Sequence, residues 1–396
     1  MSLCPYCDFV VYAGTVARGP GARVDAYTHA LLAEIELRAD ALDAAFGRVG
    51  VGPRALLETV YLGGGTPTLL PGASIAATLD LVRARFGVAP GAEVTIESNP
   101  GPDERGDMAA LVAAGVNRLS LGAQAFDPDL LRHLGRRHRA EDVADAVREA
   151  RAAGIGSVSV DLLYDVPGQD LDAWGTTLEA ALDLGVDHVS AYALTLDDPD
   201  EEGLTGPLGD HLPTRPGARR WREAAVRAQD DDRAAALYVL AVERLGAAGL
   251  RGYEISNWAR PGHESRHNLV YWQRRPYEAV GPGAHAFDGV TRRWNAARLE
   301  GYLAALAPAD GSVPSLPPGG SEVLDPATAT AEETILALRL DTGLTRDAAQ
   351  TGPLASHLDW ALAAGLLEVA EAPAGPCVRL TTAGRLLSNE LFARLV

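Results

Sequence analysis

Two cysteines, Cys4 and Cys7, stand three positions apart at the start of the chain, within the hexapeptide CPYCDF. The chain has three cysteines in all, and the third, Cys377, lies near the other end. A CxxC pair in a long chain with so few cysteines is typical of soft-metal or cluster ligands, or of a redox pair, rather than of a structural disulfide. The spacing alone leaves these uses open.

A run of three glycines, Gly63, Gly64 and Gly65, follows the strand-like run at 56–62 directly and precedes Thr66. Glycine permits positive φ angles and close approach of a ligand to the backbone, while exposed amides and the threonine hydroxyl can bind a carboxylate. The run has neither the GxGxxG spacing of a dinucleotide site nor the GK[ST] of a P-loop. It predicts a ligand-binding turn of another kind.

The elements that must position these residues are short apolar runs alternating with helical patterns, which predict βα units and a parallel sheet. We expect strands at 56–62, 93–98, 117–122, 157–163 and 188–194. The expected helices include 100–115, 140–153 and a final one at 384–396. Because ligands bind at the carboxyl ends of parallel strands, we note the polar residues there, namely Glu97, Gln124, Asp161 and Tyr192. A buried carboxylate needs a partner or a polar ligand. Each acid could simply cap neighbouring backbone, but the joint pattern favours a site.

Composition limits the class of protein. The 396 residues, 47% of them hydrophobic, can form one large domain and a smaller one. The net charge of −18 argues against binding to nucleic acid or to an anionic membrane. No apolar run could span a bilayer and no signal peptide is evident, so we expect a cytoplasmic protein without an integral membrane segment.

Three features mark the rest of the chain. The stretch 201–232, rich in Gly, Pro and charge, predicts a surface insertion or a lid, and its Asp230–Asp232 run predicts a helix start rather than a metal site. The stretch 316–320 is linker-like. Beyond it, predicted helices and a hairpin of 366–369 with 377–380 indicate a winged-helix-like module, for which the acidic charge disfavours DNA binding. We therefore divide the chain into domains at 1–200, 201–315 and 316–396.

Further motifs occur in order along the chain: ESNPG at 97–101, NRLSLGAQ at 117–124, LGRRH at 134–138, DLLYDVPGQ at 161–169 and HNLVYW at 267–272. Together with CPYC and GGGTP, they make the chain resemble the radical S-adenosylmethionine (SAM) superfamily, and within it the oxygen-independent coproporphyrinogen III oxidase-like group. The resemblance implies an α/β fold, a partial (β/α)6 barrel with a C-terminal α+β winged-helix-like domain.

The resemblance also implies two cofactors. One is a [4Fe-4S] cluster held by a CxxxCxxC motif, with Cys4 and Cys7 as metal ligands, and the other is SAM, which binds the open iron. Carried over by motif, Gly64, Gly65 and Thr66 would hold the methionine end of SAM. The remaining polar groups of SAM would contact Glu97, Gln124, Arg136 and Asp161.

The chain departs from this pattern at its start. A CxxxCxxC motif ending at Cys7 would have its first cysteine one position before Met1, and the first barrel strand of the family would also lie upstream. We expect either that the native start lies upstream or that the chain is a degenerate paralogue. As it stands, the sequence predicts poor cluster binding or none.

Phe9 and the HNxxYW motif indicate the branch of the group. Coproporphyrinogen dehydrogenases carry a fourth cysteine where this chain has Phe9, which disfavours decarboxylase activity, whereas HNxxYW is associated with haem in the haem-chaperone branch. The resemblance therefore implies haem binding by His267, Asn268, Tyr271 and Trp272. Taken alone, such a histidine is more often a hydrogen-bonded core residue, and His285 is an alternative iron ligand.

We therefore expect a haem chaperone that binds haem and passes it to a haem-requiring acceptor, such as a respiratory protein. Two alternatives are an oxygen-independent coproporphyrinogen III oxidase and a haem-binding protein without a cluster. Whether SAM is cleaved, which protein accepts haem, and the oligomeric state are left open by the sequence.

Overall fold

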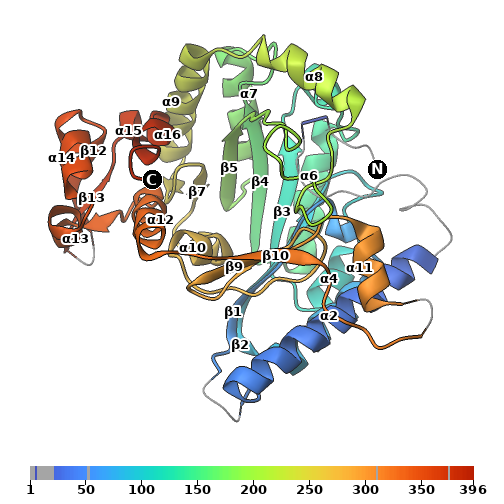
Figure 1. The fold of residues 1–396 in the computed structure, drawn as a ribbon. Coiled ribbons are helices and arrows are strands. Elements are labelled where there is room, and N and C mark those ends of the chain that lie inside the picture. Colours follow the sequence, from blue (N-terminus) through green and yellow to red (C-terminus); the bar gives the residue numbers. More distant parts are fainter. Residues whose placement is uncertain (1–4, 7–21, 51–53, 309–310, 373–374) are drawn as a thin grey trace.

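The structure, a computed structural model, describes residues 5–6, 22–50, 54–308, 311–372 and 375–396 (Figure 1). Cys4, Cys7 and Phe9 lie outside these ranges. A seven-stranded sheet forms the centre, in the order β1-β2-β3-β4-β5-β7-β6. Its strands are β1 (Leu57–Leu62), β2 (Val88–Ser98), β3 (Arg118–Gln124), β4 (Ser157–Tyr164), β5 (His188–Ala193), β6 (Arg251–Gly252) and β7 (Asn257–Ala259). Strands β1 to β5 are parallel, which confirms the five predicted strands and the α/β class.

Helices connect the parallel strands and cover one face of the sheet. They are η1 (Pro67–Leu69), α3 (Gly72–Phe86), α4 (Met108–Ala113), α5 (Pro128–His133), α6 (Ala140–Ala153) and α7 (Leu171–Asp183). The helix α2 (Ala22–Phe46) precedes β1 and packs against α3. The prediction that a helix begins at Pro100 is wrong. The helix begins only at Met108, because residues 101–105 form a turn onto the Gly101 carbonyl and the Asp107 side chain caps the helix at the Ala110 amide.

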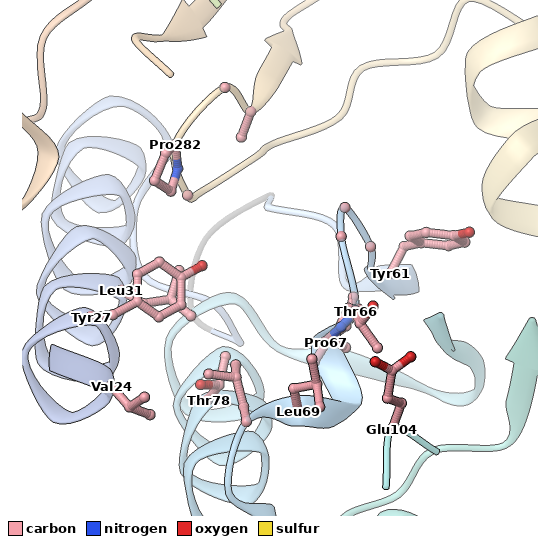
Figure 2. A pocket seen from close by; sticks show the side chains of 18 of the residues that line it. Val24, Tyr27, Leu31, Tyr61, Thr66, Pro67, Leu69, Thr78, Glu104 and Pro282 are labelled. Atoms are coloured by element: carbon pink, nitrogen blue, oxygen red, sulfur yellow. The ribbon is translucent and has the colours of Figure 1, made fainter. Parts of the chain in front are cut away.

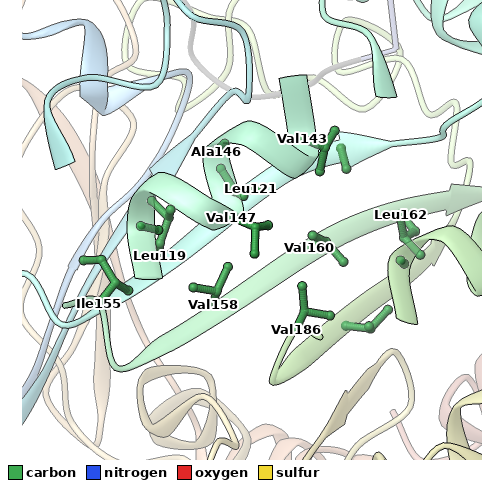
Figure 3. Close-up of a cluster of buried hydrophobic side chains, with 14 of the residues drawn as sticks. Leu119, Leu121, Val143, Ala146, Val147, Ile155, Val158, Val160, Leu162 and Val186 are labelled. Carbon is green, nitrogen blue, oxygen red and sulfur yellow. The ribbon is translucent and has the colours of Figure 1, made fainter. Parts of the chain in front are cut away.

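The two faces of the sheet differ in polarity because successive side chains of a strand point to opposite faces. Leu119 and Leu121 of β3 and Val158, Val160 and Leu162 of β4 are fully buried beneath α6 (Figure 3). Burial of each such side chain stabilises the fold by about 1.5–3 kcal/mol. The residues between them are polar and lie on the inner face of the curled sheet. The apolar core thus fixes where the polar residues point.

The chain between the barrel and the C-terminal part forms helices and a second sheet. Its elements are α8 (Pro216–Val226), α9 (Asp231–Ala247), α10 (Arg266–Trp272), β8 (His285–Phe287), β9 (Thr291–Asn295), α11 (Leu299–Leu306) and β10 (Gly319–Val323). Asp230 caps α9 by accepting the Arg233 amide at 2.7 Å, which confirms the predicted helix start. The linker prediction is wrong for Gly319 and Gly320, which pair with β9. A Cβ on Gly320 would lie 2.2 Å from the Trp294 ring, so glycine allows this close packing.

The C-terminal part combines helices with a small antiparallel sheet of order β11-β13-β12. Its elements are α12 (Pro326–Arg339), β11 (Leu344–Thr345), α13 (Arg346–Thr351), α14 (Ala355–Ala363), β12 (Leu367–Ala372), β13 (Gly375–Leu380), α15 (Thr382–Leu386) and α16 (Ser388–Phe392). The predicted hairpin is confirmed as β12 and β13, where Cys377 is buried and free. The single last helix predicted at 384–396 is instead two short helices that meet at Leu387. Within the described ranges, no helix is both long and apolar enough to cross a membrane.

Candidate functional site

Two carboxylates from neighbouring parts of the sheet lie on its inner face. Glu97, near the end of β2, accepts the Tyr61 hydroxyl on Oε1 at 2.8 Å and the Gly64 amide on Oε2 at 2.8 Å. Burial raises the pKa of Glu97 to about 7. Asp161 of β4 accepts the Ser120 hydroxyl at 3.1 and 3.2 Å, and burial raises its pKa as well. Both acids therefore have the hydrogen-bond partners that their position demands.

Asn99 connects the glycine turn to Arg136. Its Nδ2 donates to the Thr66 hydroxyl at 2.9 Å and to Glu104 Oε2 at 2.9 Å, while its Oδ1 accepts from Arg136 Nη1 at 3.0 Å. One short amide side chain thus sets the position of a hydroxyl on one side and of a guanidinium on the other. Asn99 lies within the ESNPG motif, but the motif by itself assigned it no role.

Gln124 has an unusual backbone that directs it into the same region. Its φ angle is 67°, and the β3–β4 register shifts between Leu121 and Gln124. A Cβ on Gly122 would lie 3.0 Å from Gln124 Nε2 and 3.1 Å from Arg136 Nη2, so a larger residue there would displace the ends of these two side chains by a few tenths of an ångström. A strained non-glycine residue of this kind is common at functional sites. The structure therefore brings one set of predicted residues together at the carboxyl ends of the strands: Gly64, Gly65, Thr66, Glu97, Gln124, Arg136 and Asp161.

The charges of this constellation are incompletely paired. Arg136 Nε is buried and has no hydrogen-bond partner. Among the described residues, no basic side chain forms an ion pair with Glu97 or Asp161, and the charge on Asp161 helps to raise the pKa of Glu97. A ligand with both a carboxylate and cationic groups would match a guanidinium whose buried Nε has no partner, beside two carboxylates. SAM has this combination of charges, so the residues present fit it.

A cavity of about 1110 Å³ adjoins the glycine turn on an apolar side. Figure 2 shows Tyr27 and Leu31 of α2 facing Thr66 and Pro67 across it. Gly63, Gly64 and Gly65 also line the cavity, whereas Glu97, Gln124, Arg136 and Asp161 do not. A charged cofactor needs polar partners, so the constellation on the inner face is the better candidate for its site than this cavity.

The HNxxYW motif forms α10, which packs against β1. Both nitrogens of the His267 ring are hydrogen bonded. One bond joins Nδ1 and the Thr59 hydroxyl at 2.9 Å, and the other joins Nε2 and the Tyr271 hydroxyl at 2.7 Å. It stacks on the Tyr61 ring with centroids 4.9 Å apart. Burial lowers the pKa of His267 to about 4, so its imidazole is neutral at physiological pH. In the structure, His267 is thus a fully hydrogen-bonded histidine.

The other motif residues point in different directions. The guanidinium of Arg339 lies over the Trp272 ring, 4.2 Å from the ring centroid. The indole nitrogen of Trp272 is buried without a hydrogen-bond partner. Asn268 is partly buried in the first turn of α10, where its main-chain N–H donates to Ser265 Oγ at 3.3 Å. The alternative ligand His285 lies apart from the motif, with its side chain 47% exposed and its Nε2 2.8 Å from an Asp210 oxygen.

Sequence reasoning missed Tyr61, which joins the two predicted sites. Its ring stacks on His267 and its hydroxyl donates to Glu97, which in turn accepts the Gly64 amide. The available signal was its place between the apolar Val60 and Leu62, which puts Tyr61 on the opposite face of the strand, with the other polar residues.

Comparison with known proteins gives concordant matches. The radical SAM superfamily matches residues 2–181. The chain is 40% identical over 397 positions to the haem chaperone HemW of Mycobacterium tuberculosis H37Rv, covering 100% of this chain and 92% of the relative. It is 29% identical to HemW of Bacillus subtilis 168, covering 98% and 95%. The solved coproporphyrinogen III oxidase HemN of Escherichia coli, a radical SAM enzyme, is 21% identical with a TM-score of 0.74, covering 99% of this chain and 87% of HemN. At that identity the likeness establishes the fold alone.

Proposed function

Because this chain belongs to the radical SAM superfamily, in the group of the haem chaperone HemW, we propose that it binds haem and delivers it to a haem-requiring acceptor protein, such as a respiratory protein. The support is its identity with HemW proteins along nearly their whole length. We also propose that it acts in the cytoplasm. The fold is shared with HemN, but no feature of the described residues favours porphyrinogen decarboxylation over haem binding.

The observation that carries the proposal is the continuity between α10 and the polar constellation. His267 stacks on Tyr61, Tyr61 donates to Glu97, and Glu97 accepts the Gly64 amide at 2.8 Å. The proposed haem motif and the proposed SAM turn are thereby joined by one ring stack and two hydrogen bonds. Such contact is expected of a protein in which the two ligands act together, and it has no evident use in a protein that binds only one.

For SAM, we propose that Gly64, Gly65 and Thr66 hold the methionine end. Gly63 and Gly64 have exposed backbone, and Gly64 and Gly65 have φ angles of 84° and 67°. A turn of this shape presents main-chain groups to a ligand at little steric cost. The carboxylate of Glu97 would receive a cationic group, and the free Arg136 Nε an anionic one.

Gln124 and Asp161 would complete the SAM contacts from β3 and β4. Cys4 and Cys7, which lie outside the described residues, are the proposed ligands of a [4Fe-4S] cluster. When bound, the cluster and SAM would supply one-electron chemistry at a carbon–sulfur bond.

For haem, we propose a site on α10 formed by His267, Asn268, Tyr271 and Trp272. The lowered pKa of His267 keeps its imidazole neutral, which is the form that ligates iron. Iron binding at His267 requires release of one of its two ring hydrogen bonds. Tyr271 and Trp272 would contribute aromatic surface for the macrocycle.

The test is a haemin titration of the purified full chain, followed by mixing with the apo form of a b-type haem protein. We expect saturable binding seen in the Soret band, and transfer of haem that is faster than from free haemin. Absence of saturable binding would overturn the proposal. Conversion of coproporphyrinogen III with release of carbon dioxide in the presence of SAM and a reductant would assign the chain to the oxidase activity instead.

A further inference from the structure

The helix α8, within the stretch predicted to be an insertion or a lid, contacts the peptide between Cys4 and Cys7. Its Arg222 is only 5% exposed. Arg222 Nε donates to the Pro5 carbonyl at 3.1 Å, Nη2 donates to the Tyr6 carbonyl at 3.2 Å, and Nη1 donates to the Asp197 carbonyl. A single buried guanidinium thus joins the start of the chain to the segment that follows β5.

The side chain of Tyr6 is held at the same place. Its ring lies 6.2 Å from that of Trp221, the residue before Arg222, and the guanidinium of Arg136 lies 6.0 Å from its centroid. Tyr6 also packs on the apolar cluster formed by Leu130, Leu131, Leu134, Leu163, Val166 and Leu194, and its hydroxyl is buried. The two described residues of the CPYC loop are therefore fixed through both main chain and side chain (Figure 1 shows α8 across the upper end of the sheet).

We propose that Arg222 is a positioning residue that holds the CPYC loop in place, and that α8 is a clamp for this loop rather than a mobile lid. The physical reason is that a buried guanidinium needs acceptors for its planar set of donors, and the carbonyls of Pro5 and Tyr6 supply them. Since the guanidinium cannot be left unpaired, the loop and α8 are stable only together.

The role of this loop in binding a cluster rests on the proposed function, but the clamp itself can be tested without any cofactor. Chymotrypsin cleaves after exposed aromatic residues, and in the clamped loop the Tyr6 ring is packed against Trp221 and the apolar cluster. The assay is release of the N-terminal peptide ending at Tyr6 from the apo full chain, followed by mass spectrometry. Cleavage after Trp174, which is 0% exposed in the folded chain, reports general unfolding.

We expect Arg222→Ala and Arg222→Lys to accelerate release at Tyr6 by about fivefold or more. Alanine removes the charge-assisted hydrogen bonds to Pro5 and Tyr6, and the single ammonium of lysine cannot reproduce the planar set of donors that reaches three carbonyls at once. The matched control is Arg219→Ala, which removes an arginine of the same helix that pairs instead with Asp198 and Asp200. This control should release the peptide at the rate of the unchanged protein. Equal rates of release in Arg222→Lys and the unchanged protein would overturn the proposal.

If Arg222→Ala accelerates cleavage after Trp174 as well, the variant unfolds globally, and the result for Arg222→Lys, which retains the charge, decides the question. After iron and sulfide reconstitution, the clamp further predicts less iron per chain in Arg222→Lys with haemin binding unchanged. If the unchanged protein does not bind haemin, the proposed function is contradicted, whereas the proteolysis result is unaffected.

Discussion

Substitution of Tyr61 by Phe isolates the hydroxyl that links the two sites. The change removes the 2.8 Å hydrogen bond to Glu97 Oε1 and leaves the ring that stacks on His267. Glu97 keeps its other bond, from the Gly64 amide. Since the Tyr61 hydroxyl favours the ionised carboxylate against the effect of burial, its loss should raise the pKa of Glu97 above about 7.

The size of the effect follows from the strength of the lost bond. A hydrogen bond to a charged group contributes about 1.5–3 kcal/mol, of which about 1.4 kcal/mol would move the pKa from about 7 to about 8. If SAM binds the ionised form of Glu97, the variant should bind SAM about tenfold more weakly at pH 6, about threefold at pH 7.5 and almost equally at pH 9. Titration of the SAM amino group affects both proteins alike and cancels from the ratio.

The measurement is isothermal titration with SAM from pH 6 to 9, on samples of equal iron content. Tyr271→Phe is the matched control, because it removes a hydroxyl that bonds to His267 and not to Glu97. An affinity ratio between Tyr61→Phe and the unchanged protein that does not vary with pH would refute the reasoning.

Three further outcomes follow from buried groups. Glu97→Gln should raise the free energy of unfolding by about 3 kcal/mol at pH 8 and leave it unchanged below pH 4.5, because a pKa raised to about 7 makes folding progressively less favourable as pH rises from 4.5 to 7. Urea unfolding at both pH values tests this, and an equal difference at both would contradict it. His267→Ala should weaken haemin binding about tenfold or more while His285→Ala leaves it unchanged, measured by Soret titration; the reverse result would place the ligand at His285. Arg339→Ala should lower the free energy of unfolding by about 3 kcal/mol, because Glu254 is 0% exposed and loses its ionic partner. Adding Glu254→Gln should restore part of the lost stability, and full stability of the single variant in urea unfolding would contradict the argument.

The parallel strands were predictable because a buried strand leaves a local signature. Each run of apolar residues with its polar alternates is readable within about six residues, and the helix predicted at 140–153 has those bounds in the structure. The placement of Glu97 and Asp161 on one face of the sheet was predictable for the same reason, since the ends of parallel strands meet at one edge of the sheet. The local sequence pattern and the general topology of parallel sheets were sufficient to predict these strands and the placement of the two acids.

Contacts between distant segments were not predictable in this way. Arg222 bonds to a residue 217 positions away, and Thr59 bonds to His267 across 208 positions. Nothing in the composition of either segment identifies its partner, because a guanidinium can donate to any carbonyl that the fold brings near it. The linker-like appearance of Gly319 and Gly320 misled for a related reason, since these glycines serve close packing against Trp294 and not flexibility.

The position of His267 makes haem binding and SAM binding interdependent, on the proposed sites. Both ring nitrogens of His267 are already hydrogen bonded, to Thr59 and Tyr271, so iron can bind only after one bond is released and the ring shifts on Tyr61. Because Tyr61 holds Glu97 at the glycine turn, this shift should weaken SAM binding, and SAM should weaken haemin binding by the same factor. In Tyr61→Phe the stack persists but its bond to Glu97 does not, so haemin should still bind and should no longer change SAM affinity. Titration of SAM with and without saturating haemin measures this, and a haemin effect of equal size in the variant would show that the coupling takes another route.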